Sequence, residues 1–156
     1  MNISRRNFSF FLASTVLVSG LSATPGVKAG EMAVIKVYKS PWCGCCGAWV
    51  DHIKANGFGV DVTELEDVTP IKKQYGIQPE LHSCHTALID GYVIEGHVPA
   101  QDIERLILER PNAKGLAVPG MPVGSPGMES GARKDPFNVV IFDDKGTAVF
   151  SRYNEA

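Results

Sequence analysis

Two short apolar runs, residues 86–89 and 92–95, are separated only by Asp90-Gly91. Each run is rich in residues that are typical of β-strands. Asp-Gly is a preferred sequence for the two-residue turn of a β-hairpin, in which consecutive strands pair antiparallel. Any fold of this chain must therefore contain an antiparallel hairpin over residues 86–95.

Strand and helix patterns alternate on both sides of this hairpin. They predict, in chain order, a strand over 32–38, a helix over 47–56, a strand over 60–65, a short helix from Thr69 to Gly76 and, after the hairpin, a helix that begins at Pro99. We expect Thr69 to cap the short helix, with Pro70 at its first position.

This order of elements is that of the thioredoxin-like fold, an α/β fold made of a βαβ unit, a connecting helix and a ββα unit. The first helix is a crossover connection, so the first two strands should be parallel. Residues 137–153 predict a second hairpin, which we expect to extend one edge of the sheet. Between these parts, residues 111–136 contain five glycines and five prolines. They predict a loop without regular structure, and such long loops are usually functional or disordered.

The N-terminal residues have the layout of a secretory signal peptide. Arg5-Arg6 precede an apolar run over residues 8–21, which is too short to span a membrane as a helix, and the small residues of a cleavage site follow. We expect export by the twin-arginine route, removal of residues 1–29 and a periplasmic domain over residues 30–156. An uncleaved amphipathic anchor is the alternative.

The charge of the predicted mature domain excludes some classes of partner. The leader carries three of the chain's 15 basic residues and none of its 17 acidic residues, so the remaining part has a formal charge of −5. No basic cluster remains, which argues against nucleic-acid binding and against stable membrane association after cleavage. The remaining length suffices for one domain with its own core.

All four cysteines lie in the predicted mature domain, and three of them, Cys43, Cys45 and Cys46, fall within four residues. An even number of cysteines in an exported protein usually indicates structural disulfides, but a bond within this cluster would barely constrain the unfolded chain. The cluster lies between the first strand and the first helix, where helix N-terminal amides favour thiolate, the form that attacks disulfides or binds metal. Cys43 and Cys46 also have the C-x-x-C spacing of redox enzymes.

The fourth cysteine, Cys84, immediately precedes the third predicted strand. In a thioredoxin-like fold this position lies beside the first strand–helix junction, so we expect the four sulfurs to meet; a buried structural cysteine is the alternative. Adjacent thiolates favour bridging of several soft ions over closure around one zinc ion, and sulfur selects Cu(I). Four thiolates would be neutralised by about four Cu(I) ions.

Four further side chains are candidates for additional metal ligands. Met121 and Met128 bring thioether sulfur from the Gly/Pro-rich segment, although methionine also fills gaps in apolar cores. His97 precedes the last helix near the expected cluster. His85 is adjacent to Cys84, and the alternative is that it points to the opposite face of the sheet.

Four other side chains are assigned more ordinary roles. We expect His52 and His82 at the surface, Trp49 in the core, and Trp42 as a shield over the cysteine cluster.

Several motifs together resemble one known family. They are Cys43-Gly44-Cys45-Cys46-Gly47, Ser83-Cys84-His85-Thr86-Ala87, Gly91-Tyr92, Glu95-Gly96-His97-Val98-Pro99, Gly115-Leu116-Ala117-Val118-Pro119-Gly120-Met121-Pro122 and Gly124-Ser125-Pro126-Gly127-Met128-Glu129. The combination is similar to that of the CopG-type periplasmic copper-resistance proteins and spans essentially the whole mature chain. The resemblance implies a thioredoxin-like fold, a multi-copper cluster bridged by the four cysteines, and a redox role in copper tolerance.

The leading hypothesis is a periplasmic Cu(I)-binding protein that holds several copper ions in a cysteine-bridged cluster. It would sequester copper, pass it to an efflux or redox partner, or interconvert copper oxidation states as a copper oxidoreductase. The alternative from another class is a thiol–disulfide oxidoreductase in which Cys43 attacks and Cys46 resolves. A third hypothesis is a chaperone that delivers single Cu(I) ions.

Overall fold

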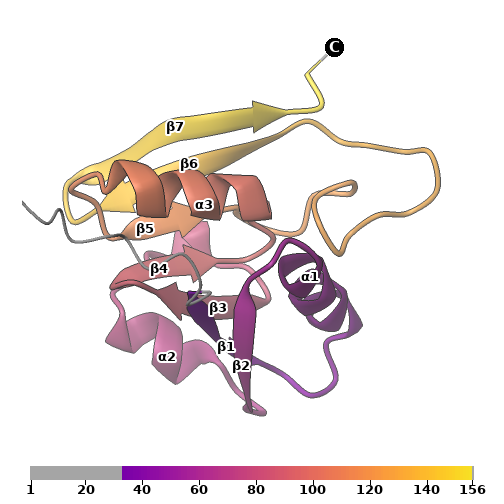
Figure 1. The fold of residues 1–156 in the computed structure, drawn as a ribbon, viewed down its shortest axis with the longest axis horizontal. Helices are drawn as coiled ribbons and strands as arrows, with labels where there is room; N and C mark the ends of the chain where they lie inside the picture. Colours follow the sequence, from indigo (N-terminus) through magenta and orange to yellow (C-terminus); the bar gives the residue numbers. More distant parts are fainter. Residues whose placement is uncertain (1–32, 156) are drawn as a thin grey trace, which may run out of the picture. The chain divides into compact units, whose positions relative to one another are not determined.

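Figure 1 shows the protein as a computed structural model that describes residues 33–155. The signal peptide predicted for residues 1–29 lies outside the described residues. None of the helices described here is long and apolar enough to cross a membrane.

Residues 33–155 form a mixed α/β structure with a seven-stranded sheet in the order β2-β1-β3-β4-β5-β6-β7. The strands are β1 Val34–Lys39, β2 Gly59–Glu64, β3 His85–Ile89, β4 Tyr92–Glu95, β5 Gly115–Ala117, β6 Phe137–Asp143 and β7 Gly146–Tyr153. The helices are α1 Gly44–Ala55, α2 Thr69–Gln74 and α3 Ala100–Glu109, and a 3-10 turn, η1, spans Pro79–Leu81. The predicted α/β class is confirmed.

The two strand pairs for which the sequence predicted a direction, β1 with β2 and β3 with β4, have that direction. Strand β1 pairs parallel with β2 and antiparallel with β3, and β3 pairs antiparallel with β4. Asp90 and Gly91 both have positive φ, at 50° and 85°, as a type I′ hairpin turn requires. This arrangement is compatible with the predicted thioredoxin-like fold.

Helices cover both faces of the sheet. On one face, Trp49 and Ile53 of α1 and Ile103 and Leu106 of α3 pack with inward-facing residues of the strands in one buried apolar cluster. The segment from α2 to η1 covers the other face, where Ile77 and other apolar residues form a second cluster. Trp49 is fully buried, as predicted.

The Gly/Pro-rich segment is more ordered than its composition predicted. Strand β5 lies within it and pairs with β4 on one side and β6 on the other. Gly115 makes this possible, because a Cβ atom at that position would lie 1.7 Å from the carbonyl oxygen of Val93. The predicted second hairpin, β6–β7, does extend one edge of the sheet, and β5 is the strand that joins it to β4.

The rest of this segment is held by its own hydrogen bonds. Met128 N–H donates to Ser125 O at 2.8 Å, and Asp135 N–H donates to Val123 O at 2.8 Å. Ser125 itself is fully buried. The prediction of a structureless loop over residues 111–136 was therefore wrong. Turns within the segment pair backbone N–H and C=O groups that a prediction from composition assumes to be bound to water.

Two helix starts also differ from the prediction. Helix α1 begins at Gly44 rather than at residue 47, so two of the clustered cysteines lie in its first turn. In α2, Thr69 is the first helical residue rather than the cap, and Val68 occupies the cap position. The side chain of Asp67 accepts the Thr69 N–H at 2.8 Å and so supplies the acceptor that was expected from Thr69.

Candidate metal centre

The four cysteines come from two segments that the sheet brings together. Cys43 precedes α1, Cys45 and Cys46 lie in its first turn, and Cys84 lies immediately before β3. Since β1 leads into α1 and pairs with β3, the two segments meet at the same end of these two strands. The four sulfur atoms all lie within 4.8 Å of one another, so the predicted convergence is found.

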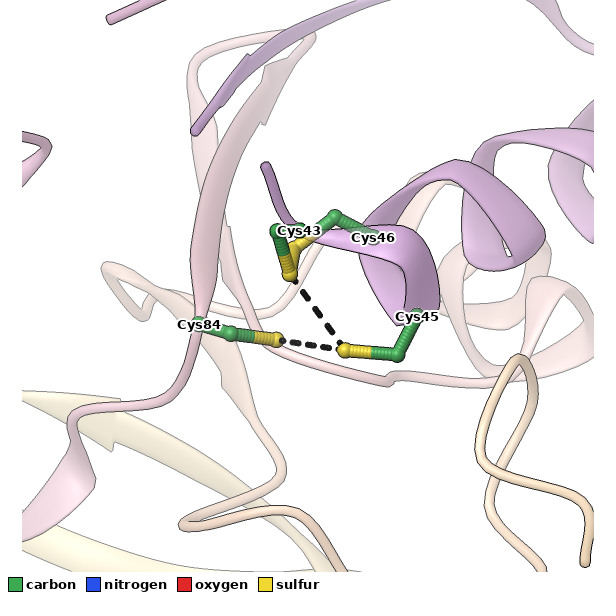
Figure 2. Close-up of side chains that lie close together, drawn as sticks. All are labelled: Cys43, Cys45, Cys46 and Cys84. Atoms are coloured by element: carbon green, nitrogen blue, oxygen red, sulfur yellow. Dashed lines mark hydrogen bonds between the residues drawn. A yellow bond between two sulfur atoms is a disulfide. The ribbon is translucent and has the colours of Figure 1, made fainter. Parts of the chain in front are cut away.

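Two of the four sulfurs are bonded and two are free. Cys43 and Cys46 form a disulfide, whereas Cys45 and Cys84 are free thiols. In Figure 2, dashed lines join the Cys45 sulfur to the Cys43 sulfur, 3.3 Å away, and to the Cys84 sulfur, 3.8 Å away. A disulfide across three positions closes too short a loop to stabilise the fold much, so reactivity is the better explanation for it.

The Cys84 thiol is held in its neutral form. Burial raises its pKa to about 12, and the neighbouring Cys45 sulfur contributes in the same direction. Without a metal ion, Cys84 is therefore a protonated thiol at neutral pH. A metal ion that binds its sulfur must displace this proton.

His97 presents a ring nitrogen to the same sulfur. Its Nδ1 lies 2.8 Å from the carbonyl oxygen of Pro126, which can only accept, so Nδ1 carries the proton. The other nitrogen, Nε2, is then an acceptor, and it receives the Cys84 thiol, whose Sγ lies 2.9 Å away. Burial lowers the pKa of His97, so the imidazole is neutral and suited to metal binding.

His85 is fully buried and also lies close to Cys84 Sγ. Its Nδ1 is 3.5 Å from that sulfur, and its ring centroid is 4.4 Å from that of Trp49 and 5.1 Å from that of His97. Burial is the main cause that lowers the pKa of His85 well below its usual value, and the neighbouring His97 and Lys72 act in the same direction. His85 thus faces the site rather than the opposite side of the sheet. Cys84, His85 and His97 form a second donor group within 4.8 Å, which shares Cys84 with the sulfur group.

The two predicted methionines lie in a segment that borders the site. Gly120, which precedes Met121, receives a hydrogen bond from the Ser83 hydroxyl, next to Cys84. Gly127, which precedes Met128, packs so closely on α1 that a Cβ atom there would lie 2.8 Å from the carbonyl oxygen of Cys45. The Met121 side chain is exposed and that of Met128 is half-buried. In Figure 1 this segment runs between β5 and β6 and reaches α1.

Three of the more ordinary assignments need correction. Trp42 is 85% exposed and so does not shield the cysteines. His52 is half-buried, and its Nε2 accepts the Ala100 N–H at 3.2 Å, which links α1 to α3. His82 is also half-buried, with its Nε2 3.1 Å from Ile77 O.

One buried polar group beside the site was missed. Glu95 at the end of β4 is fully buried and pairs with Lys72 of α2 at 2.5 Å. The same carboxylate contacts Thr86 and Ser83, on either side of Cys84 and His85. The register of the hairpin predicts Thr86 opposite Glu95, which is a usable signal, but nothing in the sequence pattern pointed to Lys72.

Comparisons with known proteins cover the same residues. Residues 81–128 match a family described as a protein of unknown function, DUF411, and this range holds Cys84, His85, His97 and both methionines. No curated protein sequence matches the chain.

Two solved structures match much more of the chain. Both are described as copper resistance protein CopG, one as form 2 and the other as form 1, with TM-scores of 0.76 and 0.75 and sequence identities of 46% and 45%. In each case the match covers 80% of this chain and 100% of the solved one. The chain therefore belongs to the CopG family of copper resistance proteins.

Proposed function

We propose that the protein binds Cu(I) in a cysteine-bridged cluster of several copper ions and acts in copper resistance by sequestering, transferring or oxidising and reducing copper. The observation that carries this proposal is the meeting of four sulfurs from two distant segments within 4.8 Å. Thiolate sulfur is a preferred ligand of Cu(I), and thiolates in this number and proximity can bridge several ions. The related proteins are themselves described as copper resistance proteins.

The disulfide sets how much copper the site can hold. While Cys43 and Cys46 are bonded, only Cys45 and Cys84 offer thiolates. Addition of two electrons and two protons, from a dithiol for example, breaks the sulfur–sulfur bond and yields two more thiols. A cluster that uses all four cysteines can therefore form only in the reduced protein.

The two histidines extend the donor set on the side of Cys84. His97 Nε2 is aimed at the sulfur by the Nδ1 hydrogen bond to Pro126, and His85 Nδ1 lies 3.5 Å from the same atom. Imidazole is a common copper ligand. Met121 and Met128 could add thioether ligands if the segment that carries them closes further over the site.

A second candidate function is favoured by the disulfide itself. The C-x-x-C pair Cys43 and Cys46 is oxidised, as in thiol–disulfide oxidoreductases, and the Cys45 thiol lies 3.3 Å from the Cys43 sulfur. A dithiol enzyme has no use for Cys84 and His97 beside this pair, whereas a metal site does. This difference places the metal function first.

Anaerobic Cu(I) titration tests the proposal. We expect more than one Cu(I) per reduced chain, with ultraviolet charge-transfer absorption, and a smaller number when the Cys43–Cys46 disulfide is left intact. Cys84→Ser should lower the capacity of the reduced protein. Saturation at one ion would support a single-ion chaperone, and no binding together with rapid disulfide reduction would support the oxidoreductase.

We also propose that the protein works in the periplasm after twin-arginine export. The support is the sequence alone: Arg5-Arg6, the short apolar run and the small residues before position 30. Mass spectrometry of the periplasmic protein should show a chain that begins at Gly30. An intact Met1 on membrane-bound protein would contradict export with cleavage.

A further inference from the structure

The carboxylate of Glu95 contacts both ends of the segment that carries Cys84. Its Oε1 accepts the backbone N–H of Ser83 at 2.6 Å, and its Oε2 accepts the Thr86 hydroxyl at 2.7 Å. The ammonium group of Lys72 completes the group, 2.5 Å from Oε1 and 3.1 Å from the Thr86 oxygen. Glu95 is fully buried and Lys72 nearly so.

Ser83 and Thr86 bracket Cys84 and His85, so one side chain fixes both ends of a four-residue segment. At Thr86 the carboxylate acts across the β3–β4 ladder, in which Thr86 is opposite Glu95. At Ser83 it reaches beyond the strand and receives a backbone N–H that lies outside the ladder. The position of the Cys84 sulfur is thereby tied to β4.

Stability alone is a poor explanation for this ion pair. Removing two charges from water is costly, and replacing a buried ion pair with apolar residues is often neutral or stabilising. The hydrogen bonds to the carboxylate are charge-assisted, and such bonds are shorter and stronger than neutral ones and fix geometry more tightly. The contacts made by Glu95 are therefore better explained by what they position.

We infer that Glu95 is a positioning residue for Cys84, holding its sulfur within reach of Cys45 and His97, and that Lys72 neutralises the carboxylate that does so. The inference rests on the proposed function, in which Cys84 is the one cysteine ligand from outside the first helix region. It adds a role for two residues that do not themselves bind metal.

Paired substitutions separate the hydrogen bonds from the charges. Lys72→Met with Glu95→Leu removes both charges and both acceptors, and it leaves no unpaired charge in the core. Lys72→Met with Glu95→Gln removes both charges but keeps an amide oxygen that can still accept the Ser83 N–H. Asp102→Asn is the matched control, because Asp102 is also a buried carboxylate, but it holds Tyr153 of β7 instead of the cysteine segment.

The first measurement needs no copper. In the disulfide form only Cys45 and Cys84 are free, and their sulfurs are 3.8 Å apart, so phenylarsine oxide should bridge them in the wild type. We expect the Leu variant to lose the bridged adduct, and the Gln variant and Asp102→Asn to keep it. A folded Leu variant that is bridged as fast as the wild type would overturn the inference. If the Leu variant does not fold, Thr86→Val takes its place: slower bridging supports the inference, and bridging at the wild-type rate overturns it.

The second measurement is Cu(I) affinity by competition with a chromophoric chelator. The Leu variant should bind Cu(I) about 10- to 100-fold more weakly, the range typical for loss of a residue that orients a metal ligand, with recovery in the Gln variant. Unchanged affinity and unchanged bridging in the Leu variant would refute positioning and leave the proposed function standing. A wild type that binds no copper would refute the proposed function, and the arsenical result would still decide whether Glu95 positions Cys84.

Discussion

Nε2 of His97 lies 2.9 Å from Sγ of Cys84, although the two residues are 13 positions apart in the sequence. The same sulfur lies 3.8 Å from that of Cys45. Cys84 therefore belongs both to the group of four sulfur donors and to a group with two imidazole donors. A copper ion bound to Cys84 can take ligands from either group.

His97→Gln tests the imidazole side of this arrangement. We expect Cu(I) affinity to fall by about 10- to 100-fold, because the substitution removes either a ligand or the group that orients one. Anaerobic competition with a chromophoric Cu(I) chelator measures this change. His82→Gln is the control, since the His82 ring contacts Ile77 O and not a cysteine. Equal Cu(I) affinities in the two variants would mean that His97 contributes to packing and not to copper binding.

A pair of glycines tests whether the methionine-bearing segment must dock on α1. Gly127 and Gly131 both have positive φ, at 82° and 60°, so alanine strains the backbone at either one. Only at Gly127 would a Cβ atom collide with α1, 2.6 Å from Trp49 N, whereas nothing lies within 4 Å of one at Gly131. Gly127→Ala should therefore undock the segment and weaken Cu(I) binding more than Gly131→Ala.

Hydrogen exchange of residues 115–130 provides the direct readout for this pair. We expect faster exchange in Gly127→Ala than in Gly131→Ala, and slower exchange in the wild type once Cu(I) is bound. Equal exchange with and without copper would show that Met121 and Met128 are not ligands. Equal exchange in the two variants would show that contact with α1 does not hold the segment.

Local sequence patterns were sufficient to predict much of the fold and the meeting of the cysteines. The Asp90-Gly91 turn defined the pairing of β3 with β4, and the thioredoxin-like order of elements then placed Cys84, just before β3, beside the end of β1. Both inferences depend on short-range signals and on the rules that govern strand connections. The exposure of Trp42 was missed, because no pattern indicates whether a single residue in a turn faces its neighbours or solvent.

Features that depend on distant partners could not be predicted in this way. Strand β5 has only three residues, and its pairing depends on the absence of a side chain at Gly115 next to Val93. The Lys72–Glu95 ion pair joins two residues 23 positions apart that carry no common motif.

Acidification should destabilise the copper-free protein before its carboxylates titrate. Burial holds the pKa of His85 well below the value of about 6.5 expected in the unfolded chain, so the folded state binds fewer protons. The contribution of neutral His85 to the stability of the folded state is therefore fully present above about pH 6.5. It is lost as the pH falls below that value, by up to about tenfold in the folding equilibrium constant per pH unit. The pKa of His97 and of His52 is also lowered by burial and acts in the same direction.

Urea unfolding between neutral pH and about pH 5 measures this effect, because carboxylates titrate mainly below that range. His85→Leu should flatten the pH dependence. Wild-type stability that is constant over this range would mean that His85 takes up a proton in the folded state without cost.

Copper should suppress any disulfide exchange by the protein. In an insulin-reduction assay, the reduced Cys43–Cys46 pair can pass two electrons to an insulin disulfide, and a dithiol in the assay restores it. Thiolates that bridge copper ions are poorer nucleophiles, so stoichiometric Cu(I) should stop the reaction, and Cys43→Ser should abolish it without copper. Rapid turnover that copper does not inhibit would favour the oxidoreductase function.

X-ray absorption at the copper K-edge of the reduced, Cu(I)-loaded protein tests the central proposal most directly. A cluster bridged by Cys43, Cys45, Cys46 and Cys84 predicts the edge of Cu(I), a first shell dominated by sulfur and a distinct copper–copper scattering contribution. A spectrum with no copper–copper contribution and a first shell of nitrogen or oxygen would contradict the cluster.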